Sequence, residues 1–111
     1  MDNIITFEDF TKVDLRIGTI IEVNDFPEAR RPAYQLKIDF GDLGVKKTSA
    51  QITTVYTKEE LFQKQVVAVV NFPEKQIGRF MSECLLLGAV DGREVIILTP
   101  EDHVKNGLTV S

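Results

Sequence analysis

The sequence holds little cysteine and histidine, and it has no long apolar run. Its one cysteine, Cys84, cannot form a disulfide within the chain, and this favours a protein of a reducing cytoplasm. Its one histidine, His103, has no cysteine nearby, so neither a zinc site nor a base–nucleophile pair is indicated. The longest apolar run has about seven residues, far short of the roughly 18 that span a bilayer. These shortages predict a soluble, cytoplasmic protein without a metal site.

Motifs of secreted, nucleotide-binding and catalytic proteins are also missing. The acidic start, residues 1–10, lacks the apolar core of a secretory signal. No GxGxxG or Walker sequence occurs, so no nucleotide cofactor is indicated. Carboxylates are scattered along the chain, and with 17 acidic residues in 111 their chance pairs are uninformative. We therefore expect a binding protein that needs no cofactor, rather than an enzyme.

The chain has the length of one domain and an excess of negative charge. Its 111 residues suit a single domain, and a net charge of −4 with a pI near 5.0 argues against non-specific wrapping of a long polyanion. Basic residues nevertheless gather in or near two loops, at Arg30, Arg31, Lys37, Lys46, Lys47, Lys75 and Arg79. A local basic patch is therefore compatible with the acidic total.

Alternation of apolar and polar residues predicts a protein built mainly of β-strands. The predicted strands cover residues 15–23, 34–40, 45–52, 66–70, 84–90 and 95–99. In the first strand the pattern places Ile21 on the inner face and leaves Ile20 on the outer face as an exception. Gly18 inside this strand indicates a bulge or a barrel bend. The inward residues of the second strand are Tyr34, Leu36, Ile38 and Phe40.

Two capping patterns predict short helices that complete an OB-fold. Thr6 with Asp9 caps a helix near the N-terminus, and Thr57 with Glu60 caps another between the third and fourth strands. Three strands, a helix and two further strands follow the order of an OB-fold, an all-β, five-stranded Greek-key barrel. The short helices are then N-terminal and between strands 3 and 4.

The OB-fold indicates where a ligand binds. Its binding face is formed by strands 2 and 3 and by the loops that join strands 1 to 2 and strands 4 to 5. In this chain those loops are residues 24–32 and 71–83, and both carry Phe-Pro-Glu followed by basic residues. We therefore expect the two loops to meet beside one binding face.

Particular stretches of the chain resemble a known family, the OB-fold tRNA-binding domain that occurs alone and appended to some aminoacyl-tRNA synthetases. They read VDLRIGTI, LKIDFG, YTKEELFQKQVVAVVNF and GRFMSECLLLGA. The likeness covers residues 7–111, which we expect to form one domain after a lead-in of residues 1–6. Three stretches are similar to the CsaA-type proteins of this family, namely FPEARRPAYQLKIDFG, KKTSAQIT and VVNFPEKQIGRFMSE.

The resemblance implies a function and an assembly. CsaA-type proteins are small, homodimeric and associated with protein export as chaperones, which implies unfolded or export-bound polypeptides as partners and the export machinery as a further candidate. A tRNA-binding module is the alternative. RNA-binding relatives tend to read Asn-Leu-Lys-Pro-Ala-Lys where this chain reads Asn-Phe-Pro-Glu-Lys-Gln from Asn71. Basic charge is therefore lost in this stretch and Glu74 adds an acid, and this speaks against tight tRNA binding.

Candidate binding residues lie in the segment 71–83. Phe72 and Phe80 either present an apolar surface to a peptide or a stacked base, or they cap the barrel and fill a dimer interface. Lys75 and Arg79 are candidates to hold phosphates or acidic side chains, and a solvated loop explains them about as well.

Further candidates lie outside that segment or at its ends. Arg30 in the first loop, Lys46 on the third strand and Gln51 after it complete the expected peptide- or RNA-binding set, with ordinary surface polarity as the alternative explanation. Asn71 and Ser82 end the long loop, and we expect their side chains to brace it by hydrogen bonds.

Apolar residues near both ends of the chain exceed the number that one closed barrel buries. They include Ile4, Ile5, Val104, Leu108 and Val110. Burial against a twofold mate accounts for them, because a symmetric interface covers the same patch on both subunits. We therefore expect a homodimer.

Overall fold

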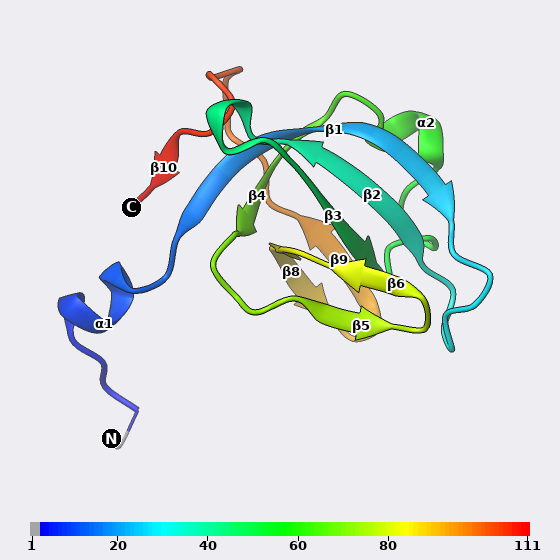
Figure 1. The fold of residues 1–111 in the computed structure, drawn as a ribbon, viewed down its shortest axis with the longest axis horizontal. Helices are drawn as coiled ribbons and strands as arrows, with labels where there is room; N and C mark the ends of the chain where they lie inside the picture. Colours follow the sequence, from blue (N-terminus) through cyan, green and yellow to red (C-terminus); the bar gives the residue numbers. More distant parts are fainter. Residues whose placement is uncertain (1–2) are drawn as a thin grey trace.

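The chain folds into a nearly closed β-barrel, as the sequence predicts (Figure 1). The computed structural model describes residues 3–111, so Met1 and Asp2 of the expected lead-in lie outside the described residues. The main sheet has the strand order β3-β2-β1-β4-β7, with β10 paired to β1. Its strands are β1 (Leu15–Asp25), β2 (Tyr34–Asp39), β3 (Val45–Ala50), β4 (Gln65–Val69), β7 (Leu85–Leu86) and β10 (Thr109–Val110).

Short helices and two hairpins complete the fold. These elements are α1 (Phe7–Thr11), the 3-10 helix η1 (Gly41–Leu43), α2 (Lys58–Leu61), β5 (Lys75–Ile77), β6 (Phe80–Ser82), β8 (Gly88–Asp91) and β9 (Glu94–Ile97). Both predicted capping boxes form: the N–H of Asp9 donates to Thr6 Oγ1 at 3.1 Å, and that of Glu60 donates to Thr57 Oγ1 at 3.1 Å. Hydrogen bonds from Thr57 lower the pKa of the Glu60 carboxyl.

The core lies inside the barrel, and β4 is the strand that is buried on both faces. The predicted inward residues of β2 are all buried, with Leu36, Ile38 and Phe40 at most 1% exposed. The remaining buried members of this cluster are Ile20, Tyr34, Ile52, Leu61, Val66, Ala68, Cys84 and Ile97. Leu61 of α2 is fully buried in the same cluster, so the short helix closes one end of the barrel.

The predicted phase of β1 is wrong before a bulge in the strand, where Gly18 and Ile20 face the core, and right after it, where Val23 packs against the core. Its register against β2 shifts between Ile20 and Glu22, so Ile21 is the extra residue. Ile20 is therefore fully buried in the core, whereas Ile21 is 40% exposed. Gly18 marks a close approach rather than the bulge, because a Cβ there would lie 2.5 Å from Ile38 Cγ2.

The segment 71–83 is a hairpin and not an irregular loop. β5 pairs with β6 from Lys75 opposite Ser82 to Ile77 opposite Phe80, and Gly78 supplies the positive φ that the turn requires. The predicted strand 84–90 is also split, into β7 and β8. Leu87 between them donates its N–H to the Val67 carbonyl, and its own carbonyl accepts from the Leu98 N–H. It therefore connects β4 to the residue that follows β9.

One seam joins β3 to the segment between β6 and β7 and so closes the barrel. The N–H of Glu83 donates to the Lys47 carbonyl at 2.7 Å, and the Glu83 carboxylate accepts from the Lys47 N–H at 2.9 Å. The buried Thr48 hydroxyl donates to the Cys84 carbonyl at 2.7 Å. This seam, defined by Lys47, Thr48, Glu83 and Cys84, also fixes the β5–β6 hairpin against β3.

The bulge predicts opposite outcomes for two neighbouring isoleucines. Ile20→Ala removes a fully buried side chain and should lower the free energy of unfolding by about 2–5 kcal/mol. Ile21→Ala trims a side chain that is 40% exposed and should lower it by less than about 1 kcal/mol. Urea unfolding followed by circular dichroism measures both values, and a larger loss for Ile21→Ala would contradict the register described here.

Candidate functional site

The two loops that the sequence marks as unusual lie against each other. The rings of Phe26, from the first loop, and Phe80, from the hairpin, pack with centroids 5.3 Å apart and a tilt of 53°. Lys47 Nζ lies 5.3 Å from the centroid of the Phe80 ring. Phe26 is buried and Phe80 is half-buried, so this aromatic pair joins the loops and leaves only part of Phe80 to a ligand.

Phe72 is the aromatic residue of the hairpin segment that faces solvent most fully. It is 55% exposed and lies in the link from β4 to β5, whereas Phe80 begins β6 beside the turn. The length of β5 separates the two residues. They therefore do not form one continuous apolar surface, and an apolar contact made by this hairpin falls mainly to Phe72.

In the part of the chain that the structure describes, the predicted cations have no acidic partners. Arg30, Lys75 and Arg79 are exposed and Lys46 is half-buried. The ion pairs within residues 3–111 join Lys12 to Asp9, Arg16 to Asp14, Lys37 to Glu22 and Lys58 to Asp25, and so involve none of these four cations. The positive charge of these side chains is therefore available to an acidic or phosphorylated ligand.

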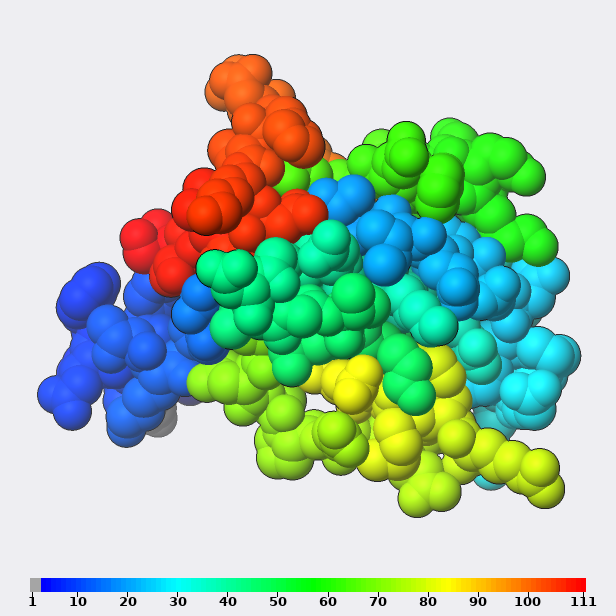
Figure 2. Space-filling model, turned by 45° about the horizontal axis from the view of Figure 1, so that its top comes forward, coloured from blue at the N-terminus to red at the C-terminus, as the bar shows by residue number. Residues whose placement is uncertain are grey.

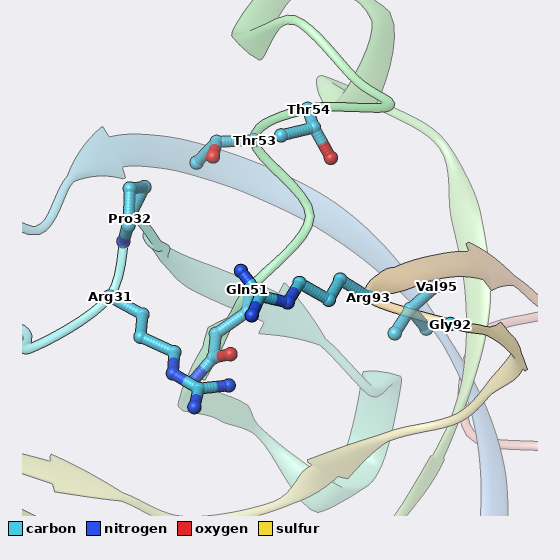
Figure 3. Close-up of a pocket in the computed structure, with 8 residues that line it drawn as sticks. All are labelled: Arg31, Pro32, Gln51, Thr53, Thr54, Gly92, Arg93 and Val95. Atoms are coloured by element: carbon cyan, nitrogen blue, oxygen red, sulfur yellow. The ribbon is translucent and has the colours of Figure 1, made fainter.

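Gln51 lies in a pocket of about 440 Å³ together with residues that the sequence did not single out. The pocket gathers Arg31 and Pro32 from the first loop, Gln51, Thr53 and Thr54 from the segment after β3, and Gly92, Arg93 and Val95 from the β8–β9 hairpin. Figure 3 shows Arg31 and Arg93 extending toward Gln51 from different parts of the chain. No sequence pattern signals this, because the turn that carries Arg93 reaches the first loop only through the tertiary fold.

The side chains of Asn71 and Ser82 hydrogen-bond to other parts of the fold. Asn71 bonds to the backbone before β1, and Ser82 bonds to residues of the seam. Asn71 Oδ1 accepts from the Asp14 N–H at 2.9 Å, and its Nδ2 donates to the Lys12 carbonyl at 2.7 Å. Ser82 Oγ lies 3.2 Å from Thr48 Oγ1. Asn71 thus ties the exit of β4 to the link between α1 and β1, and Ser82 extends the seam.

Cys84 is chemically inert in this position, and the structure offers no metal cluster. The thiol is buried, and burial raises the pKa of Cys84 to about 12, so the thiol stays protonated at neutral pH. Within residues 3–111, no group of three or more His, Cys, Asp and Glu side chains is placed to hold a metal ion. Over the same range, every helix is too short or too polar to cross a membrane.

Comparison with known proteins places this geometry in a family. A family model described as "Putative tRNA binding domain" matches residues 15–109. The crystal structure of chaperone CsaA from Bacillus anthracis is 50% identical and superposes with a TM-score of 0.93 over 97% of this chain and 99% of that chain. The CsaA chaperone protein from Picrophilus torridus is 52% identical, with a TM-score of 0.91 over 97% and 100% of the two chains.

Longer proteins contain a similar segment. The methionine–tRNA ligase of Thermococcus kodakarensis is 41% identical over 106 residues, which make up 96% of this chain and 14% of the ligase. The ligase of Pyrococcus abyssi is 42% identical over the same shares. The chain thus spans 14% of the length of these curated relatives. From the family match and the CsaA structures together, the chain belongs to the putative tRNA-binding domain family and, within it, to the CsaA-type proteins.

Proposed function

We propose that this protein is a non-catalytic, chaperone-like protein that holds unfolded or export-bound polypeptides. The observation that carries the proposal is the exposed Phe72 on a hairpin whose two cations, Lys75 and Arg79, have no acidic partner within residues 3–111. An apolar group flanked by unpaired charges suits a chain that presents apolar and acidic segments in turn. Similarity to the CsaA chaperones supports the same function.

The described geometry gives the proposed residues different roles. Phe72 covers apolar side chains of the bound polypeptide, and Arg30, Lys46, Lys75 and Arg79 attract its acidic segments. Phe80 supports the site more than it contacts the ligand, because Phe26 and Lys47 cover much of its ring. The apolar surface of the proposed site therefore comes mainly from Phe72, and not equally from both phenylalanines.

Binding of tRNA is the second candidate function. The description of the family and the similarity to methionine–tRNA ligases favour it. The same four cations would then lie on phosphates, and Phe72 under a base. Glu74, an exposed acid between Phe72 and Lys75, opposes a phosphate at that position. Both candidate functions fit the cytoplasm, which stays a prediction.

We further propose that the protein acts as a homodimer, because an apolar row on the outer face of the barrel is only partly covered within one subunit. The strand pairings align Val110, Leu15, Val69 and Leu85 across β10, β1, β4 and β7. Val69 follows the core residue Ala68 in β4, and neighbouring side chains of a strand point to opposite faces, so the row faces outward. Leu85 at its end is 48% exposed. Val69 is already buried, and a second subunit on this face would remove the exposed parts of Leu15, Leu85 and Val110 from water.

The N-terminal segment supplies a second apolar surface for the same interface. Ile4 is 80%, Ile5 65% and Phe7 78% exposed, so these side chains find no cover within one subunit. Figures 1 and 2 show the N-terminal segment beside the C-terminal strand at one end of the molecule. Leu108, which precedes β10, is 46% exposed there. Val104, another expected dimer residue, is half-buried, and its backbone is bonded to the Gln65 side chain at the start of β4.

A salt titration separates the two candidate ligands. If Arg30, Lys46, Lys75 and Arg79 each neutralise a phosphate, log K for single-stranded RNA falls with log salt at a slope of about −2.8. Raising the salt from about 50 to about 200 mM then weakens tRNA binding about fifty-fold. Apolar burial has no counterion term, so an unfolded polypeptide should stay bound. Fluorescence anisotropy measures both; submicromolar tRNA binding at the higher salt, without polypeptide binding, would make tRNA the ligand.

Phe72→Ala tests the apolar contact against a matched phenylalanine. Phe62 of the α2 region is 51% exposed, close to the 55% of Phe72, and lies outside the proposed site. Phe72→Ala should weaken binding of an unfolded polypeptide at least about tenfold, because burying an aromatic side chain contributes about 1.5–3 kcal/mol. Phe62→Ala should leave it unchanged. Equal losses in the two variants, with folding intact by circular dichroism, would show that Phe72 is not a specific contact.

The dimer proposal predicts the sedimentation behaviour of the protein. At micromolar concentration the purified protein should sediment with twice the mass of the 12.5 kDa chain. Ile5→Asp places a charge in the proposed interface and should shift the equilibrium to monomer, because an unpaired buried charge is costly. Phe62→Asp is the control and should remain dimeric. A monomeric wild-type protein under these conditions would rule the proposal out.

A further inference from the structure

The pocket between the first loop, the segment after β3 and the β8–β9 hairpin has the size and chemistry of a ligand site. Its volume of about 440 Å³ lies in the range of about 300–1,000 Å³ that small-ligand pockets occupy. The residues come from three separate parts of the chain, so the pocket exists only in the folded protein. Arg31 and Arg93 are the charged residues among those that line it.

Within the described residues, the polar side chains that line this pocket form no ion pair and no hydrogen bond with other protein groups. Within residues 3–111, Arg31 and Arg93 take part in no ion pair. Over that same range, the side chains of Gln51, Thr53 and Thr54 likewise form no hydrogen bond to another protein group. Donors and acceptors that converge on a hollow without internal partners are available to a ligand.

Nearby acids do not neutralise the pocket. Asp91 and Glu94 flank the turn that carries Arg93, and their register pairs them with each other. Val90 pairs with Val95, and Val95 lines the pocket. Because side chains alternate along a strand, Asp91 and Glu94 point to the opposite face of the hairpin. The pocket therefore keeps the charge of its two arginines.

We propose that this pocket binds a carboxylate of a bound polypeptide, supplied by its C-terminus or by an Asp or Glu side chain. Two guanidinium groups match a carboxylate, which accepts paired N–H donors from arginine. Gln51, Thr53 and Thr54 both donate and accept, as an adjoining peptide backbone requires. Pro32 and Val95 add apolar contacts on opposite sides of the pocket for neighbouring side chains. No aromatic residue is among the lining residues, so a nucleobase has no stacking platform there.

This inference rests on the proposed polypeptide-binding function and extends it. The pocket is separate from Phe72 and from the hairpin cations, none of which line it. It thus adds a polar anchor to an apolar contact, and the two together select a chain with an acidic group next to apolar residues. The two contributions are separable by substitution, because they involve different residues.

Three labelled peptides of one apolar sequence test the pocket by fluorescence anisotropy. One has a free C-terminus, one is amidated, and one is amidated with an internal Glu. The wild-type protein should bind the free acid or the Glu peptide at least about tenfold more tightly than the neutral amide, as expected for charge-assisted hydrogen bonds. Which of the two charged peptides gains affinity identifies the source of the carboxylate.

Substitution of the two arginines should remove this preference. The double variant R31Q/R93Q should bind all three peptides with the affinity of the neutral amide, and R31K/R93K should keep part of the preference, because lysine retains charge without the planar pair of donors. Lys105→Gln, an exposed cation outside the pocket, is the matched control and should behave as wild type.

The possible failures are distinguishable. Equal wild-type affinity for the three peptides, or a preference that survives in R31Q/R93Q, would overturn the pocket proposal and leave polypeptide binding intact. No binding of any peptide would overturn both proposals. A loss of RNA oligonucleotide binding in R31Q/R93Q, with the peptide preference unchanged, would assign the arginines to phosphate instead.

Discussion

The seam at Lys47, Thr48, Glu83 and Cys84 is the contact on which the rest of the structure depends. An OB-type barrel must bring its third strand to the chain that leaves the fourth, although β7 offers only two residues to pair. The seam meets this need with three hydrogen bonds. The Glu83 N–H donates to the Lys47 carbonyl, the Lys47 N–H donates to the Glu83 carboxylate, and the buried Thr48 hydroxyl donates to the Cys84 carbonyl. Without these bonds, buried polar groups would be left unpaired and the core would open along this edge.

Closure of the barrel also creates the candidate site. The seam fixes the start of β7 and the end of β6, so it sets the position of the whole β5–β6 hairpin. Phe80 then packs on Phe26 and joins the hairpin to the first loop. β6 lies against β3, and the cations Lys75 and Arg79 lie on the hairpin that β6 forms with β5. The hydrogen bonds that close the barrel thus also position the proposed binding surface, so a change that breaks the seam should affect both stability and binding.

Local sequence patterns predicted the elements well, and tertiary contacts explain what they missed. The capping boxes at Thr6 and Thr57 and the alternation in β2 depend on near neighbours, so the sequence reveals them directly. The bulge at Ile21 depends on pairing with β2, and two adjacent isoleucines give no signal of which one turns inward. Likewise Arg93 lies in a hairpin turn with no unusual sequence pattern, and only the folded chain shows that it lines the same pocket as Arg31. The sequence therefore could not show which distant segments meet in this pocket.

The seam uses Lys47 in an uneven way. Its N–H and carbonyl close the barrel, whereas its side chain lies over the ring of Phe80 and takes no part in closure. Residue 47 can therefore change its side chain at little expense to the barrel while it alters the charge next to the aromatic pair. Because the main chain of residue 47 makes the seam bonds, a substitution there keeps the fold and changes the surface charge. The same barrel can therefore be adapted to ligands of different charge through this position.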